Sequence, residues 1–191
     1  MFIRNKQIRS NLKIAILSIV MLISGCVNTY YVPRVTPTKI ETENEHFIAN
    51  ILPACTPYAC IFIGLVIDNK SSKNIEIDWN RTFFIEDGIT KGRFTFEDIK
   101  NPISLYAFLN RKITTIIRPG YRITVMLYPI AKVLTSYEFR FRLNGSNGVY
   151  LTVIVDGKEI TEELLFDLSY IKTQNPENYP KDKSVVNLPE D

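Results

Sequence analysis

Histidine occurs only once in the 191 residues, and no glycine-rich motif is present. Hydrolysis by a Ser-His-Asp or Cys-His arrangement needs an imidazole as a base. The single candidate, His46, follows an acidic segment and precedes the first expected strand, so we interpret it as a solvated or cap-forming residue. The eight glycines are scattered, and none forms a phosphate-binding loop. We therefore expect no enzymatic activity and no cofactor.

Acidic clusters that would hold a metal ion are also scarce. Two adjacent pairs, Glu86-Asp87 and Glu97-Asp98, supply carboxylates near expected strand ends. Adjacent residues on a strand point to opposite faces, and neither pair lies in a recognisable calcium loop. The sequence therefore predicts solvated acids at these positions and no metal site.

A long apolar run is missing as well. The stretch from Ile14 to Ile23 has about ten residues, half of the roughly 20 that span a bilayer. A basic segment without acids precedes it, and small residues follow it. This order is typical of a secretory signal peptide, which we place at residues 1–25. The basic residues are Arg4, Lys6, Arg9 and Lys13.

The four residues Ile23, Ser24, Gly25 and Cys26 resemble the lipobox of bacterial lipoproteins. The resemblance implies cleavage before Cys26 by a signal peptidase of type II and acylation of Cys26 by diacylglycerol and a fatty acid such as palmitate. Ile23 stands where leucine is commoner in that family. An ordinary signal peptide with a nearby cysteine is the alternative. Two or more acyl chains anchor a protein firmly without a transmembrane helix, so the membrane lipid would be a partner of Cys26.

Removing the signal peptide changes the charge of the chain. The formal net charge falls from +3 to −1, because four basic residues and no acid are lost. A basic footprint for nucleic acid is therefore not expected. In lipoproteins of enteric-type bacteria, residues such as Val27 after the cysteine usually allow transport to the outer membrane. We expect an outer-membrane anchor facing the periplasm, or the outer face of the plasma membrane in a single-membrane host.

Cys55 and Cys60 remain after Cys26 is assigned to lipid. Disulfides persist in exported chains, so a structural disulfide contributing about 2 kcal/mol is the favoured interpretation. Two free thiols and a reactive pair are the alternatives. The C-x-x-x-x-C spacing differs from that of thioredoxin-like redox sites, and no second pair is present to complete a zinc site.

The dominant hydrophobic period between residues 46 and 170 is two. Alternation in "NIEIDW" and "YEFRFRL" predicts half-buried strands, and "CIFIGLVIDN" is apolar on both faces, which indicates a central strand. Turn signals such as "EDG", "RPG" and "DGK" separate the expected strands. Eight to ten short strands predict an all-β, immunoglobulin-like antiparallel β-sandwich. The further expected strands are 81–86, 93–96, 113–117, 121–127 and 149–155.

Three segments outside this pattern are interpreted separately. Residues 158–168 fit either a helical stripe or the return strand of a hairpin, and the Asp156-Gly157 turn favours the hairpin. Residues 26–45 carry two prolines and an acidic end, which predicts a lipidated N-terminus and flexible linker. Residues 171–191 are rich in proline and charge, which predicts a disordered tail; a tail that folds on a partner is the alternative.

The body also resembles uncharacterised bacterial lipoproteins with a sandwich domain. The shared order is "VIDNKSS", "IEIDWNRTFFIEDG", "IIRPGYRITVMLYP" and "VIVDGKEI". This resemblance implies the fold and no catalytic residue.

Two features of the body remain open to a binding role. Trp79 lies on the apolar face of its strand, which predicts a core residue rather than a ligand-stacking one. Arg140 and Arg142 are interpreted as a solvated face, with a binding stripe as the alternative. We expect a structural or protein-interaction module that binds an envelope protein through an exposed edge strand; a small-ligand or glycan binder is the alternative.

Overall fold

The computed structural model describes residues 29–56, 58–96, 110–133 and 142–173. Within them the chain is almost entirely antiparallel β-structure, as predicted from the period of two. The first strands are β1 (Tyr30–Thr36), β2 (Ile40–Glu43), β3 (Phe47–Cys55), β4 (Cys60–Asn69), β5 (Ile75–Asp78) and β6 (Phe83–Glu86). The later elements are β7 (Ile89–Thr95), β8 (Thr114–Ile117), β9 (Arg122–Pro129), the short helix α3 (Ile130–Val133), β10 (Gly145–Val155) and β11 (Lys158–Thr173).

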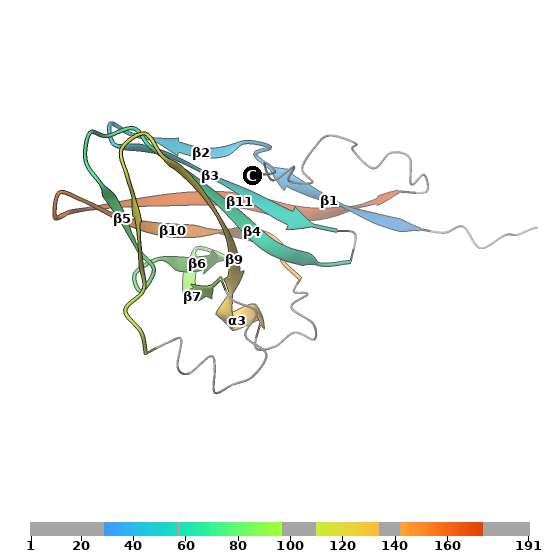
Figure 1. The fold of residues 1–191 in the computed structure, drawn as a ribbon. Coiled ribbons are helices and arrows are strands. Elements are labelled where there is room, and N and C mark those ends of the chain that lie inside the picture. Colours follow the sequence, from blue (N-terminus) through green and yellow to red (C-terminus); the bar gives the residue numbers. More distant parts are fainter. Residues whose placement is uncertain (1–28, 57, 97–109, 134–141, 174–191) are drawn as a thin grey trace, which may run out of the picture.

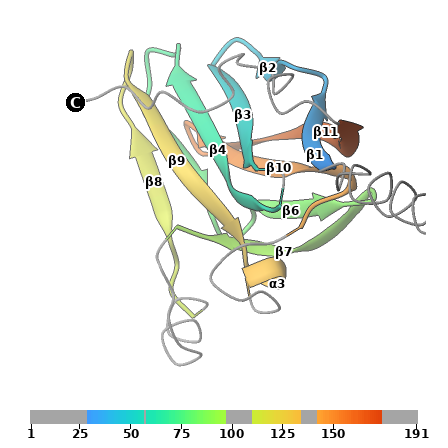
Figure 2. The same ribbon diagram turned by 90° about the vertical axis from the view of Figure 1, so that its right-hand side faces the viewer.

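The strands form one strongly curled sheet whose halves face each other (Figures 1 and 2). One half contains β1, β11, β10 and then β6 and β5, which pair with successive parts of β10. The other half contains β2, β3, β4 and β9. Strand β7 joins the halves by pairing with both β6 and β9. The all-β, sandwich-like fold expected from the sequence is therefore confirmed.

Alternate residues of both halves fill the space between them. The core is apolar and includes four fully buried phenylalanines, to which β3, β6, β7 and β11 contribute one each. These are Phe47, Phe84, Phe94 and Phe166. Isoleucine, leucine and valine from β3, β4, β5 and β10 surround them. Burial of such side chains contributes about 1.5–3 kcal/mol each, so this shared interior is what holds the two halves together.

On the side away from β7, side chains connect the two halves of the sheet. Glu162 of β11 accepts hydrogen bonds from Thr42 Oγ1 at 2.9 Å and from Asn44 Nδ2 at 3.0 Å. Strands β2 and β11 therefore lie close together without a backbone ladder between them.

The N-terminal boundary of the sandwich differs from the sequence expectation. Strand β1 pairs with β11 and β2 pairs with β3, so residues 30–36 and 40–43 belong to the sheet and not to a flexible linker over 26–45. At the other end, β11 continues to Thr173, three residues beyond the expected limit of 170. The prolines favoured a linker, but an edge strand such as β1 tolerates proline. Pro33 pairs with Tyr170 of β11.

The ambiguous segment 158–168 is a strand. It returns from the Asp156-Gly157 turn and pairs with β10 along its length, with Leu164, Phe166 and Leu168 buried. Gly148 of β10 allows this close pairing, since a Cβ atom there would lie 2.4 Å from the Leu164 carbonyl oxygen.

Some sequence predictions lie outside the described residues. The signal peptide with Cys26, most of the expected strand 137–143 and the tail from 174 are among them. Leu143, at the end of that expected strand, is described and buried. No helix in the described part of the chain has the length and apolar character needed to cross a membrane.

Candidate functional site

Trp79 lies immediately after β5 and is buried, with 4% of its surface exposed. Its indole N–H donates to Thr115 Oγ1 at 2.8 Å, and its ring packs against Phe96 with centroids 4.6 Å apart. The ring is therefore part of the core, as the alternation predicted, and offers no open face on which a ligand would stack.

His46 lies in the turn before β3, where it organises the backbone. Its amide N–H donates to Asn44 Oδ1 at 2.9 Å, and its carbonyl oxygen accepts from the amides of Lys70 and Ser71 at 2.8 and 3.0 Å. Its Nε2 atom lies 3.2 Å from Glu45 Oε1. No hydrogen bond joins His46 to a hydroxyl or thiol within the described ranges, so no nucleophile-base pair is assembled there.

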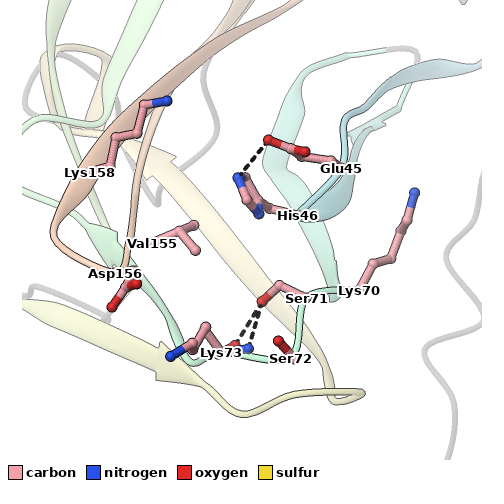
Figure 3. Close-up of a pocket in the computed structure, with 9 residues that line it drawn as sticks. All are labelled: Glu45, His46, Lys70, Ser71, Ser72, Lys73, Val155, Asp156 and Lys158. Atoms are coloured by element: carbon pink, nitrogen blue, oxygen red, sulfur yellow. Dashed lines mark hydrogen bonds and ion pairs between the residues drawn. The ribbon is translucent and has the colours of Figure 1, made fainter.

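A polar hollow of about 580 Å³ surrounds His46 (Figure 3). Its wall combines the turn before β3, the β4–β5 loop and the β10–β11 hairpin. The Oγ atom of Ser71 lies 2.8 Å from both Asn69 Oδ1 and the Lys73 carbonyl oxygen, which share its single proton, and it accepts from the Lys73 amide at 3.2 Å. The serine is therefore committed to the loop structure. The charged lining residues are Glu45, Lys70, Lys73, Asp156 and Lys158, besides His46.

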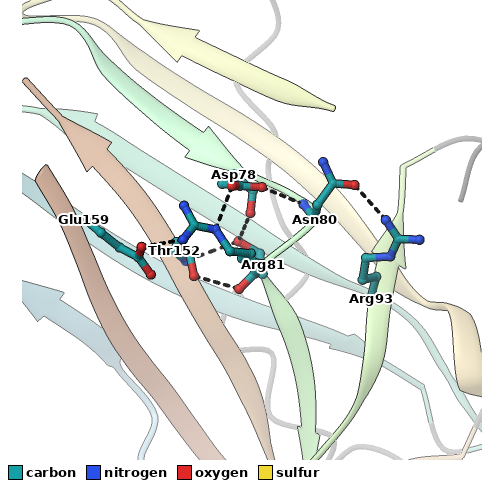
Figure 4. Close-up of polar contacts among 7 residues, drawn as sticks. Asp78, Asn80, Arg81, Arg93, Thr152 and Glu159 are labelled. Carbon is teal, nitrogen blue, oxygen red and sulfur yellow. Dashed lines mark hydrogen bonds and ion pairs between the residues drawn. The ribbon is translucent and has the colours of Figure 1, made fainter. Parts of the chain in front are cut away.

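Asp78 is the one buried charged residue among those described, and it anchors a polar network (Figure 4). Its Oδ2 atom accepts from Arg81 Nε at 2.8 Å, and its Oδ1 atom accepts from the Asn80 amide at 2.9 Å. Arg81 also pairs with Glu159 of β11, and its carbonyl oxygen accepts from Thr152 of β10. The hydrogen bond that Arg81 donates to the Asp78 carboxylate is the main cause of the raised pKa of Arg81. The carboxylate is fully engaged in joining the β5–β6 turn to β10 and β11, which is a structural role.

Of the two acidic pairs considered in the sequence, Glu86-Asp87 lies within the described residues. Glu86 pairs with Lys132 of α3, and Asp87 occupies a turn with a positive φ of 51°. Glu97 and Asp98 lie outside the described residues. In the described ranges, no group of three potential metal ligands comes together.

Cys55 and Cys60 are joined by a disulfide, as the favoured interpretation predicted. The bond closes the hairpin between β3 and β4. Thr56 organises the tip, because its hydroxyl donates to the Ala59 carbonyl at 2.9 Å and accepts from the Ala59 amide at 3.2 Å. Arg142 Nε donates to the Tyr58 carbonyl at 3.2 Å. Arg142 is thus exposed but attached to the hairpin; Arg140 lies outside the described residues.

The outer face of β9, β4 and β3 carries an apolar surface next to an open strand edge. Register places Met126, Gly64 and Leu52 in one row across the three strands. Met126 is 40% exposed and Leu52 is 37% exposed. The next row toward the hairpin holds Tyr128 and Phe62, whose rings lie edge to face with centroids 6.3 Å apart. We name these five residues the β9 surface.

The β9 surface has a defined polar border and a backbone edge to which no described strand is paired over residues 122–127. Toward the other end of β9, Arg122 forms two hydrogen bonds with the Asp68 carboxylate at 2.6 and 2.8 Å, and this contact raises the Arg122 pKa. Beyond β4, β9 pairs only with β7 in the described part of the chain, through Tyr128 and Pro129. Every second residue from 122 to 127 therefore directs its backbone N–H and C=O groups away from β4.

The sequence carries a signal for the β9 surface. The strand "CIFIGLVIDN" is apolar on both faces, a pattern that predicts a strand buried on both sides. Strand β4 is indeed central, but Phe62 and Val66 on its outer face are only partly buried. An apolar outer face on a sandwich strand indicates a contact surface.

No protein-family model matches this chain, and no curated protein matches it either. The assignment of a function therefore depends on the residues and their geometry.

Proposed function

We propose that this protein is a cell-envelope lipoprotein, anchored by acylated Cys26, whose β-sandwich is a non-enzymatic module that binds another envelope protein. The lipobox-like residues Ile23 to Cys26 support the anchor. Val27 supports an outer-membrane location with the sandwich facing the periplasm, or the outer face of the plasma membrane in a host with one membrane.

The observation that carries the interaction role is the edge of β9 over residues 122–127, unpaired among the described strands, beside exposed Met126 and Leu52. A partner strand added to this edge would satisfy the outward backbone groups of β9. Its outward side chain beside Met126 would extend the apolar row of Met126, Gly64 and Leu52, over which a neighbouring part of the partner would pack, and the Asp68–Arg122 pair would set the register at the polar border. The hydrogen bonds supply affinity and the row supplies specificity.

The alternative of a small-ligand or glycan binder has weaker support. Its expected aromatic platform, Trp79, is buried. Among the described residues, the polar hollow around His46 is the feature that favours a small ligand, but the His46 imidazole faces Glu45 at 3.2 Å and the Ser71 hydroxyl is hydrogen-bonded within its loop.

Site-specific crosslinking tests the interaction role. A photo-crosslinking amino acid is placed at Met126 or, as a matched control, at Ile89, which is 58% exposed on β7. In intact cells, position 126 should give a discrete protein adduct and position 89 should not. Leu52→Lys, which places a charge in the apolar row, should remove the adduct while the urea unfolding midpoint stays near that of the parent. The same adducts at both positions, or an adduct insensitive to Leu52→Lys, would contradict the proposal.

A further inference from the structure

The folded body begins very close to the proposed lipid anchor. Only Val27, Asn28 and Thr29 separate Cys26 from Tyr30, the first residue of β1. Four residue steps extend over at most about 13 Å. The end of the sandwich at which β1 starts is therefore held near the membrane surface if Cys26 is acylated.

Three parts of the chain meet at this end. The start of β1 pairs with the end of β11, where Tyr30 lies opposite Thr173. The disulfide hairpin of β3 and β4 points the same way (Figure 1). Arg142 connects them, because it donates to the Tyr58 carbonyl and is close enough to Tyr170 of β11 to affect that phenol electrostatically. We call residues 29–34, 53–56, 58–61, 142 and 170–173 the hairpin end.

The hairpin end exposes apolar side chains and cations. Tyr58 is 73% exposed, and Tyr31, Ile171 and Ile61 are each between 42% and 51% exposed. Lys172, Arg34 and Arg142 are also exposed, and the segments that form this end contain no acidic residue. Tyrosine side chains suit the boundary between lipid and water, since each has an apolar ring and a polar hydroxyl. Lysine and arginine are attracted to anionic lipid headgroups.

We propose that the hairpin end is a second membrane-binding site, in which Tyr58, Ile61, Tyr31 and Ile171 insert at the headgroup level and Arg142 and Lys172 contact lipid phosphates. The proposal rests on the proposed function, because acylated Cys26 is what brings this end to the lipid. The hairpin end would then keep the sandwich in contact with the membrane, instead of the sandwich moving freely on a long flexible linker.

Charge complementarity favours a lipid surface over a protein as the occupant. The segments of the hairpin end carry Arg34, Arg142 and Lys172 without an acid. At the opposite end Glu43, Glu45 and Asp156 are balanced by Lys70, Lys73 and Lys158, so that end has no excess of positive charge to attract an anionic bilayer. Weak insertion of a few side chains is enough here, because tethering by the acyl chains makes the contact an intramolecular event with a high effective concentration.

Quenching by brominated lipids tests the proposal on the full mature lipoprotein in vesicles of phosphatidylethanolamine and phosphatidylglycerol. Tyr58→Trp places a fluorophore at the hairpin end, and Tyr121→Trp is the matched control. Tyr121 is 63% exposed, and its carbonyl oxygen accepts a hydrogen bond from the amide of Asn69, which places it at the far end of β4. Lipids with brominated acyl chains should reduce the added emission of Tyr58→Trp and leave that of Tyr121→Trp unchanged. Ile171→Trp serves as a second probe if Tyr58→Trp does not fold.

The outcomes separate this proposal from the proposed function. Fatty-acid labelling that is lost in Cys26→Ser, together with quenching at the hairpin end only, supports both. If the protein is labelled but the two added tryptophans are quenched equally or not at all, the second membrane-binding site is overturned and the lipid anchor remains. Absence of labelling in the parent protein removes the anchor and overturns both.

Discussion

At the residue scale, Tyr170 has a buried hydroxyl without a hydrogen-bond partner in the described part of the chain. Burial raises the pKa of this phenol, and Arg142 opposes the shift. A raised folded-state pKa means that the folded protein holds the proton more tightly than the unfolded chain. The contribution to stability is therefore complete below the ordinary tyrosine pKa of about 10 and is lost as the pH rises through the folded-state pKa.

Tyr170→Phe tests this reasoning. The substitution removes a hydroxyl that is buried and unsatisfied, so the free energy of unfolding at neutral pH should stay the same or rise, by up to about 1 kcal/mol. Above pH ~10 the variant should lose less stability than the parent, because the other tyrosines are common to both proteins. Urea unfolding across this pH range measures both effects. Clear destabilisation at neutral pH would show that the hydroxyl has a partner.

Two single-residue features were predicted correctly from the sequence alone. Alternation placed Trp79 in the core, and the exported context favoured the Cys55–Cys60 disulfide; the structure has both. The same alternation placed Asp78 on the solvent face, but it is buried. The chain turns immediately after β5, and Arg81 folds back over the carboxylate. A period of two describes a straight strand and fails at a turn, where a partner three residues away decides the burial.

At the element scale, β1 is the strand that the sequence did not reveal. Its prolines and its position after the anchor favoured a linker, yet it pairs with β11 over seven residues. Pairing partners 120 or more residues apart leave no local signal, and an edge strand needs only one apolar face. Val32 supplies that face, with 9% of its surface exposed.

Val32→Ser distinguishes a strand from a linker. Loss of the buried side chain should lower the free energy of unfolding by about 1–2 kcal/mol, as for other small truncations of buried aliphatic residues. Arg34→Ser on the same strand removes an exposed side chain and should have little effect. Urea unfolding of the two variants under identical conditions gives the comparison. Equal, negligible effects would mean that β1 does not contribute to the sheet.

At the scale of the whole molecule, the two ends of the sandwich differ in chemistry. The hairpin end is apolar and cationic, whereas the other end holds the polar hollow around His46 (Figures 1 and 3). The β9 surface lies between them on the outer face of one layer. The sequence predicted the layers, since their alternation is local. It could not predict this difference in chemistry between the two ends, because strand pairing brings together segments as distant in sequence as residues 30 and 173.

An end-on arrangement predicts different heights above the membrane for the two ends. Strand β11 has 16 residues and spans about 50 Å at roughly 3.3 Å per residue. A fluorescent label on Asp156→Cys, in the exposed β10–β11 turn, should therefore transfer little energy to acceptor lipids in reconstituted vesicles. The same label on Ile171→Cys, near the end of β11, should transfer much more. Similar transfer from both positions would mean that the sandwich lies flat, in which case the β9 surface would have to compete with lipid for its partner.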